Sequence, residues 1–116
     1  MNVSINVAAV KDLLLRCWSK KTSSLWTAEN PARGQCGVTA LVIQDRFGGE
    51  ILKTKLDDGG WHYYNRINGR RYDFTSDQFG RAIDYMDVVT TREDALGDID
   101  KDQYGCLSSA LDEALR

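Results

Sequence analysis

The sequence predicts an α+β fold, in which helices flank a small antiparallel sheet. Two observations predict it. Residues 37–43 contain no charged side chain, which is typical of a helix buried on all sides, whereas residues 6–20 place apolar side chains at helical spacing on one face. Residues 50–75 alternate apolar and polar side chains around Asn68-Gly69, the pattern of a β-hairpin.

Composition and charge limit the class of protein. The chain has 116 residues, 42% of them hydrophobic and 28% charged, which fits one globular domain over residues 1–116. A net charge of −2 without a dense basic cluster argues against a nucleic-acid partner. No uncharged stretch is long enough to span a bilayer, and no export signal is recognisable. We therefore expect a cytoplasmic protein without a nucleic-acid or membrane partner.

Charge is unevenly distributed along the chain. Residues 1–71 carry 11 Lys/Arg and 6 Asp/Glu, a sum of +5, whereas residues 72–116 carry 4 Lys/Arg and 11 Asp/Glu, a sum of −7. Opposite charges attract across short distances in a folded chain. The two parts can attract each other within one fold, but we expect mainly solvated faces of opposite sign.

Predicted helices and strands follow one another along most of the chain. The first helix covers residues 6–20 and is followed by a polar stretch and the Asn30-Pro31 turn. The second helix begins at Cys36 and ends at Gly48-Gly49, a glycine stop. The later elements are expected as strands at 50–56, 61–67 and 70–75, a helical turn at 76–79, a strand or loop edge at 85–90, a capped helix start at 91–94, and a C-terminal helix at 104–116.

One cysteine and one histidine are candidates for nucleophilic chemistry. His62 is the only histidine, so a histidine base would have to be His62. Cys36 begins a helix, whose free N–H groups favour a thiolate and can hold an oxyanion. We therefore expect a lowered pKa for the Cys36 thiol. Cys17 and Cys106 are expected to be structural, and an odd number of cysteines, three, argues against a disulfide framework.

The hairpin selects the residue that orients the imidazole. A two-residue turn pairs Ile67 with Arg70, so that the numbers of paired residues sum to 137. His62 and Asp73 then share one face as diagonal neighbours, roughly 7–8 Å apart at their Cα atoms. Asn65 has the opposite parity and should point to the other face. We therefore expect Asp73, rather than Asn65, to orient His62.

The sequence predicts neither a metal site nor a cofactor. The cysteines and the histidine show no paired metal-ligand spacing, and no phosphate-binding glycine loop is present. Asp98, Asp100 and Asp102 resemble the start of a calcium loop, but Gln103 and Ser109 stand where Gly and Glu are needed. A solvated acidic loop or a helix cap is the expected role.

The order of these residues resembles that of the papain-like and transglutaminase-like cysteine superfamily. Gly34-Gln35-Cys36 precedes an apolar helix, and His62 and Asp73 follow on successive strands. The resemblance implies a papain-like/transglutaminase-like core, with a buried helix on a small antiparallel sheet and flanking N- and C-terminal helices. It also implies amide or thioester chemistry through an acyl-enzyme, with Cys36 as nucleophile, His62 as base and then acid, and Asp73 as orienter.

The same resemblance leaves the substrate-binding residues open. The backbone N–H of Cys36 would be one oxyanion donor, and Asn30, Gln35 and Trp26 are candidates for the second donor or for substrate contact. Transglutaminases usually carry Trp after the cysteine, where this chain has Gly37. The departure puts transglutaminase activity itself in doubt.

A second resemblance covers more of the chain. Its segments are Asn30-Pro31, Gly34-Gln35-Cys36, Thr39-Ala40-Leu41, Gln44-Asp45, Gly48-Gly49-Glu50, His62-Tyr63, Asn65-Arg66-Ile67, Tyr72-Asp73, Thr75 and Gln78-Phe79. These segments resemble the small bacterial YunG-type proteins. That group implies no activity of its own.

Three functions remain open at this point. The first is a thiol-dependent amide or thioester hydrolase, deamidase or acyl transferase, acting on a protein side-chain amide, a peptide or a small amide. The second is a non-enzymatic binding or regulatory module on the same fold. The third is a modifying effector domain that acts on a glutamine of another cell.

Overall fold

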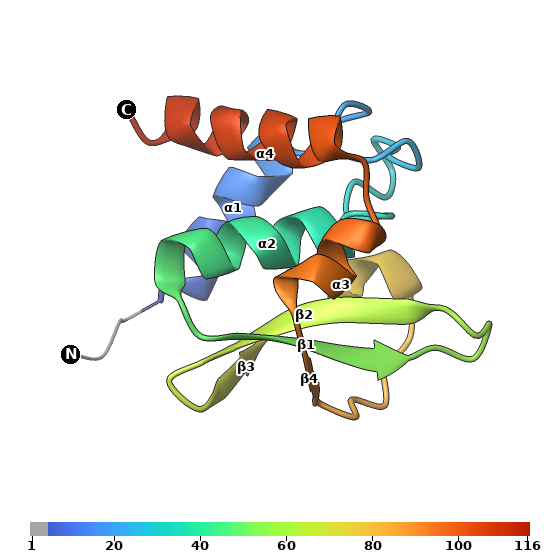
Figure 1. Cartoon of the computed structure of the whole chain (residues 1–116). Helices are drawn as coiled ribbons and strands as arrows, with labels where there is room; N and C mark the ends of the chain where they lie inside the picture. The colour runs from blue at the N-terminus through green and yellow to red at the C-terminus, as the bar shows by residue number, and fades with distance from the viewer. Residues whose placement is uncertain (1–4) are drawn as a thin grey trace.

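Four antiparallel strands form one sheet, and all four α-helices lie on the same side of it (Figure 1). The computed structural model of the protein describes residues 5–116. The helices are α1 (Val7–Cys17), α2 (Cys36–Phe47), α3 (Arg92–Gly97) and α4 (Lys101–Ala114), with a 3-10 helix η1 (Ser76–Phe79). The strands are β1 (Glu50–Lys55), β2 (Trp61–Ile67), β3 (Arg70–Tyr72) and β4 (Val88–Thr90), in the order β3-β2-β1-β4. The predicted α+β class is confirmed.

Helix α2 is the centre of the core. Its residues from Gly37 to Ile43 are all buried, as their apolar sequence predicts. One side packs on β2, where Asn65 Nδ2 donates to the Ala40 carbonyl at 3.0 Å, and the other side packs on α4. The helix ends at Gly48, whose φ of 75° lies in the region that favours glycine. The N-terminus of α2 is thereby held against the sheet.

Helices α1 and α4 cover α2 from above. The Asn6 side chain caps α1 by accepting from Ala9 N–H at 3.0 Å. Helix α4 begins at Lys101, three residues before the predicted start, because Asp100 and Gln103 form a capping box there. The interpretation of the acidic segment as a helix cap is therefore confirmed for Asp100. Leu115 is 56% exposed, so the predicted apolar stripe of the last helix ends before it.

The β2–β3 hairpin has the predicted register. Ile67 pairs with Arg70 and Asn65 with Tyr72, as the two-residue turn requires. The return strand was expected to continue to residue 75, but β3 ends at Tyr72. The carboxylate of Asp73 accepts from Thr75 N–H at 3.1 Å, which turns the chain into η1 and ends the ladder.

Strand β4 is also shorter than the predicted segment 85–90. Asp87 has a positive φ of 54°, which interrupts the extended chain before Val88. The preceding residues bind a side chain of β1 instead of its backbone. Thr54 Oγ1 donates to the Asp84 carbonyl at 2.9 Å and accepts from Met86 N–H at 2.9 Å. This segment therefore covers β1 and β2 without joining the sheet.

Strand β2 is buried on both faces. Tyr63 and Asn65 face α2, since Tyr63 packs against apolar residues of α2 and Asn65 bonds to the α2 backbone. His62 and Tyr64 alternate with them and face the other way, where Tyr64 contacts Tyr85 with ring centroids 5.0 Å apart. One face of β2 thus packs on α2, and the other face, with His62 and Tyr64, packs on the segment that contains Tyr85.

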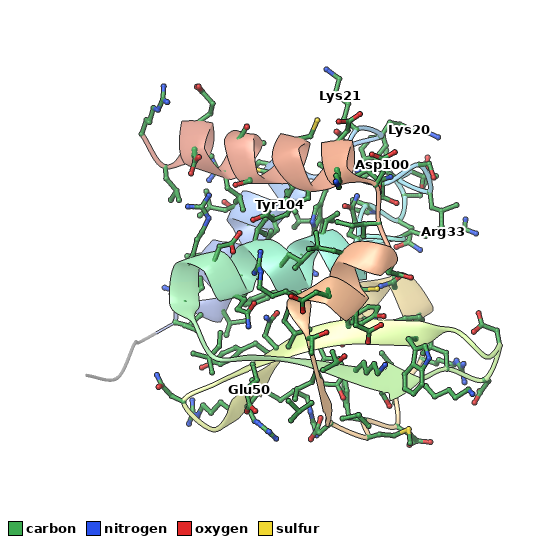
Figure 2. The ribbon with its side chains drawn as sticks, in the orientation of Figure 1. Lys20, Lys21, Arg33, Glu50, Asp100 and Tyr104 are labelled. Atoms are coloured by element: carbon green, nitrogen blue, oxygen red, sulfur yellow. The ribbon has the colours of Figure 1, made fainter. Side chains whose placement is uncertain are left out.

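Ion pairs join the positive and negative parts of the sequence, in addition to the solvated charged faces that were expected. They are Lys11–Asp77 at 2.8 Å and Arg46–Asp112, Lys53–Asp94 and Arg71–Asp87 at 2.7 Å each. Tyr104, labelled in Figure 2, points from α4 toward α2, where its hydroxyl donates to the Asp45 carboxylate. Within residues 5–116, no helix has the length and apolar character needed to cross a membrane.

Candidate functional site

Cys36 is the first residue of α2 and lies against the start of β2. No side chain caps the helix, and its backbone ladder begins with Thr39 N–H donating to the Gln35 carbonyl at 3.0 Å. The earlier N–H groups are therefore directed out of the helix end. The backbone of Tyr63, in β2, and of Gly37 is close enough to the Cys36 thiol to lower its pKa.

The predicted lowering of the Cys36 pKa is wrong. Burial raises the pKa of the thiol to about 12, and the charges of Asp98 and Asp73 raise it further. The backbone hydrogen bonds act in the opposite direction but do not compensate. Loss of hydration destabilises the thiolate more than the backbone donors at the helix end stabilise it. At neutral pH the Cys36 sulfur therefore carries its proton.

His62 and Asp73 form a direct pair on the other face of β2. His62 Nε2 lies 2.7 Å from Asp73 Oδ2, and the His62 side chain is 0% exposed. The imidazole stacks on Tyr64 with centroids 5.7 Å apart and meets the edge of Phe79 at 4.8 Å. These contacts fix the plane of the ring. The structure brings together two of the three residues that the sequence selected.

The pair also fixes where the imidazole proton lies. Burial raises the pKa of Asp73, but hydrogen bonds from His62, Tyr85 and Thr75 outweigh it and leave the pKa below its ordinary value. Asp73 is therefore an ionised acceptor, and the proton of a neutral His62 lies on Nε2. His62 Nδ1 is buried and has no hydrogen-bond partner. An unprotonated ring nitrogen without a partner can accept a proton from a group that comes within hydrogen-bond reach.

Sequence reasoning missed two residues that hold Asp73. Tyr85 donates its hydroxyl to Asp73 Oδ2 at 2.7 Å, and Thr75 Oγ1 lies 3.3 Å from Oδ1. The pKa of Tyr85 is raised, chiefly by burial and then by its bond to Asp73, so the hydroxyl stays protonated as a donor. Hairpin parity does place Thr75 on the His62 face. No sequence pattern links Tyr85 to that face, because its position depends on the path of residues 80–87.

Cys36 and His62 are not hydrogen-bonded to each other. They approach β2 from opposite faces, because Tyr63 faces α2 and His62 faces away. The β2–β3 ladder ends at the pair Asn65–Tyr72, so Tyr63 has no partner in β3.

The three other residues predicted to contact substrate differ in whether their side-chain hydrogen-bond donors are already used. Asn30 Nδ2 donates to the Gln78 carbonyl at 3.2 Å, so one of its two N–H groups holds η1. Gln35 is fully buried, and its Oε1 accepts from Thr22 Oγ1 at 2.8 Å while its Nε2 has no partner. Trp26 Nε1 is likewise buried without a partner. Gln35 and Trp26 therefore have buried donors without any partner, whereas Asn30 Nδ2 has used one of its two N–H groups.

The position after the cysteine has no room for a large side chain. A Cβ atom on Gly37 would lie 2.8 Å from Ile99 Cγ2 and 3.3 Å from Asp98 Oδ2. The segment between α3 and α4 thus packs directly on the first turn of α2. This contact gives the physical reason why a glycine stands at position 37. Across residues 5–116, His, Cys, Asp and Glu side chains form no group of three that could hold a metal ion.

The fold and these residues define a class of small α+β proteins with a cysteine at the start of a buried helix and a His–Asp pair on the adjoining sheet. The family described as "YunG protein" matches residues 6–116, and the chain belongs to this family. It is 54% identical over 102 residues to the "Uncharacterized protein YunG" of Bacillus subtilis (strain 168), an alignment covering 88% of each chain. No solved structure matches the chain. The resemblance to YunG-type proteins is confirmed.

Proposed function

We propose that the chain is a thiol-dependent amide or thioester hydrolase, deamidase or acyl transferase with a papain-like/transglutaminase-like arrangement of Cys36, His62 and Asp73. The observation that carries this proposal is the state of His62. Its Nε2 is committed to Asp73 at 2.7 Å, which leaves Nδ1 bare, buried and unpartnered. A buried polar atom without a partner is costly and is retained mainly where it has a role.

The high pKa of Cys36 favours one form of this mechanism. The raised pKa of Cys36 favours a protonated thiol at rest over a preformed thiolate. A neutral nucleophile can still act when a base removes its proton during attack, as serine does in hydrolases. His62 would therefore act as a general base on a thiol.

The reaction then proceeds in two balanced stages. Cys36 Sγ forms a bond to the substrate carbonyl carbon while its proton passes to His62 Nδ1. The same proton passes to the leaving amine or thiolate as the old bond to carbon breaks, leaving an acyl-enzyme. Water, or an amine in transfer, attacks the thioester and gives a proton to His62 Nδ1, which returns it to the departing Cys36 sulfur.

The step requires the Cys36 thiol and His62 Nδ1 to come within hydrogen-bond reach of each other, because the two are not hydrogen-bonded in the resting structure. Because β3 ends at Tyr72, no ladder hydrogen bond to β3 needs to break at Tyr63.

Acylation by an activated ester tests the proposal. The protein is incubated with p-nitrophenyl acetate, and each of the three cysteines is examined for acetylation by mass spectrometry, with Cys17 and Cys106 as internal controls. We expect acetyl transfer to Cys36, slowed at least tenfold in His62→Gln and Asp73→Asn. Both variants are first checked for native circular dichroism. Equal acetylation of Cys36 in the wild type and in folded His62→Gln would overturn the proposal.

A non-enzymatic binding or regulatory module is the second candidate function. The raised Cys36 pKa and the missing Cys36–His62 hydrogen bond favour it, since both are ordinary for a structural thiol. In this case the His62–Asp73 pair only stabilises the hairpin. The same experiment separates the two functions, because the module predicts no selective acetylation of Cys36 in any variant.

A further inference from the structure

The side chain of Gln78, on η1, is anchored at one end and unsatisfied at the other. Its Oε1 accepts from Gly34 N–H at 3.1 Å. Because a backbone N–H is a donor, the amide atom facing it must be the oxygen, which fixes the orientation of the carboxamide. Its Nε2 is buried and has no hydrogen-bond partner. Gln78 therefore holds a donor in a defined direction without an acceptor.

Gln78 lies where the two parts of the proposed site meet. Gly34, which binds its side chain, is two residues before Cys36. Phe79, the next residue after Gln78, packs its ring on the imidazole of His62 with centroids 4.8 Å apart. The Gln78 backbone carbonyl is also held by Asn30 Nδ2 at 3.2 Å. Gln78 is thus fixed between the loop that leads to Cys36, through Gly34, and the Phe79 ring that packs on His62.

This part of the molecule is accessible from an open groove. The groove has a volume of about 520 Å³ and lies between α1, the loop at residues 29–32 and η1. Gln78 and Phe79 line it, together with apolar residues such as Leu15 and Pro31 and charged residues such as Lys11 and Asp77. Apolar surface combined with fixed polar groups is typical of a site for a small organic ligand. A ligand in this groove would contact Phe79 and Gln78, and a small shift of the Gln78 side chain would bring its buried Nε2 into reach.

We propose that Gln78 is the substrate-binding donor that receives the carbonyl oxygen of an amide substrate. This inference rests on the proposed function and names the second donor beside the backbone N–H of Cys36. An amide oxygen supplies the acceptor that Nε2 lacks, and the bond strengthens as the oxygen gains charge in the tetrahedral intermediate. Before substrate binds, a water molecule can occupy the same position.

Two alkylating reagents test the inference without a known substrate. Iodoacetamide carries an amide oxygen, whereas allyl bromide has no hydrogen-bond acceptor. Both react by the same displacement, in which sulfur bonds to carbon and the halide leaves. The ratio of their rates at Cys36, read by mass spectrometry, therefore reports recognition of the amide and cancels changes in the reactivity of the thiol itself.

The decisive variant is Gln78→Glu, which keeps an oxygen for Gly34 N–H, loses the donor and adds a negative charge. Gln44→Glu, at the other end of α2, introduces the same charge change as a matched control. We expect the iodoacetamide-to-allyl-bromide ratio to fall about tenfold in Gln78→Glu, the effect of one lost hydrogen bond. The ratio should stay at the wild-type value in Gln44→Glu.

Gln78→Met is the second variant, because it removes the donor without adding charge. The same fall is expected for it. An unchanged ratio in whichever Gln78 variant remains folded would overturn the inference and leave Gln78 as an anchor of η1 only. This outcome is distinct from failure of the proposed function, which depends on acetylation of Cys36 and its response to His62→Gln.

Discussion

Tyr85 donates its hydroxyl to the same Asp73 oxygen, Oδ2, that contacts His62 Nε2, and both distances are 2.7 Å. The other carboxylate oxygen is held by Thr75. Asp73 therefore has donors on both oxygens and cannot turn away from the imidazole without breaking several charge-assisted hydrogen bonds. The tautomer of His62 follows from this clamp, so the state of the histidine is decided by a residue 12 positions after Asp73.

Tyr85→Phe should weaken the clamp. We expect the free energy of unfolding, measured in urea, to fall by about 1.5–3 kcal/mol, the usual value for a hydrogen bond to a charged group. The His62 Nε2 proton should also exchange faster with solvent. Because His62 is the only histidine, one imidazole signal in an NMR spectrum of ¹⁵N-labelled protein reports this exchange.

Tyr72→Phe is the matched control for that experiment. The Tyr72 ring stacks on Phe74 at 6.2 Å, and the substitution leaves that packing in place. We expect its stability and its imidazole signal to match the wild type. Identical proton exchange in Tyr85→Phe and Tyr72→Phe would contradict a role for Tyr85 in holding the pair.

Asp73→Asn should change how stability depends on pH. The folded pKa of Asp73 lies below its unfolded value, so its contribution is complete above about pH 4, the ordinary range of aspartate. The contribution is lost as the pH falls through the folded pKa. We expect Asp73→Asn to be less stable at pH 7 and to lose less stability than the wild type between pH 5 and the acid range, roughly pH 2.

Urea unfolding at a series of pH values measures this dependence. Asp73→Asn should still lose some stability at acid pH, because the pKa values of Asp87 and Asp94 are also lowered by their partners. Asp12→Asn, on the exposed face of α1, is the control. Parallel curves for the wild type and Asp73→Asn would show that the carboxylate does not depend on the folded environment.

The Cys36 thiol should react with iodoacetamide more slowly than a free cysteine at neutral pH. Only the thiolate reacts, and burial raises the pKa of Cys36 to about 12. We expect its rate, followed by mass spectrometry, to keep rising about tenfold per pH unit above the free-cysteine value, ~8.5. The urea-unfolded chain supplies the reference profile. A plateau near the free-cysteine value in the folded protein would contradict the burial of the thiol.

Two glycines in helices should respond to alanine in opposite ways. A Cβ on Gly37 would press on Ile99 at 2.8 Å, whereas one on Gly105, in α4, would meet nothing within 4 Å. We expect Gly37→Ala to lose about 1–3 kcal/mol through overpacking and Gly105→Ala to gain about 0.5–1 kcal/mol through helix propensity. Thermal unfolding measures both. A stabilised Gly37→Ala would show that Ile99 moves aside freely.

Much of the fold was predictable because it depends on local signals. The Asn68-Gly69 turn set the hairpin register, and the parity rule then placed His62 and Asp73 on one face. The uncharged run from Gly37 to Ile43 identified the buried helix. The ends of β3 and β4 were not predictable, because side-chain hydrogen bonds of Asp73 and Thr54 take the backbone out of the ladder.

The sequence by itself determined the order of the elements, the hairpin register and the pairing of His62 with Asp73, since these follow from spacing and from the twofold period of a strand. Only the tertiary structure decided the protonation of Cys36, the clamp by Tyr85 and the orientation of Gln78. Each of these depends on desolvation or on contacts between segments far apart in the chain. Such contacts have no periodic signal in the sequence, because they arise only when α2, η1 and residues 80–87 pack around the first half of β2.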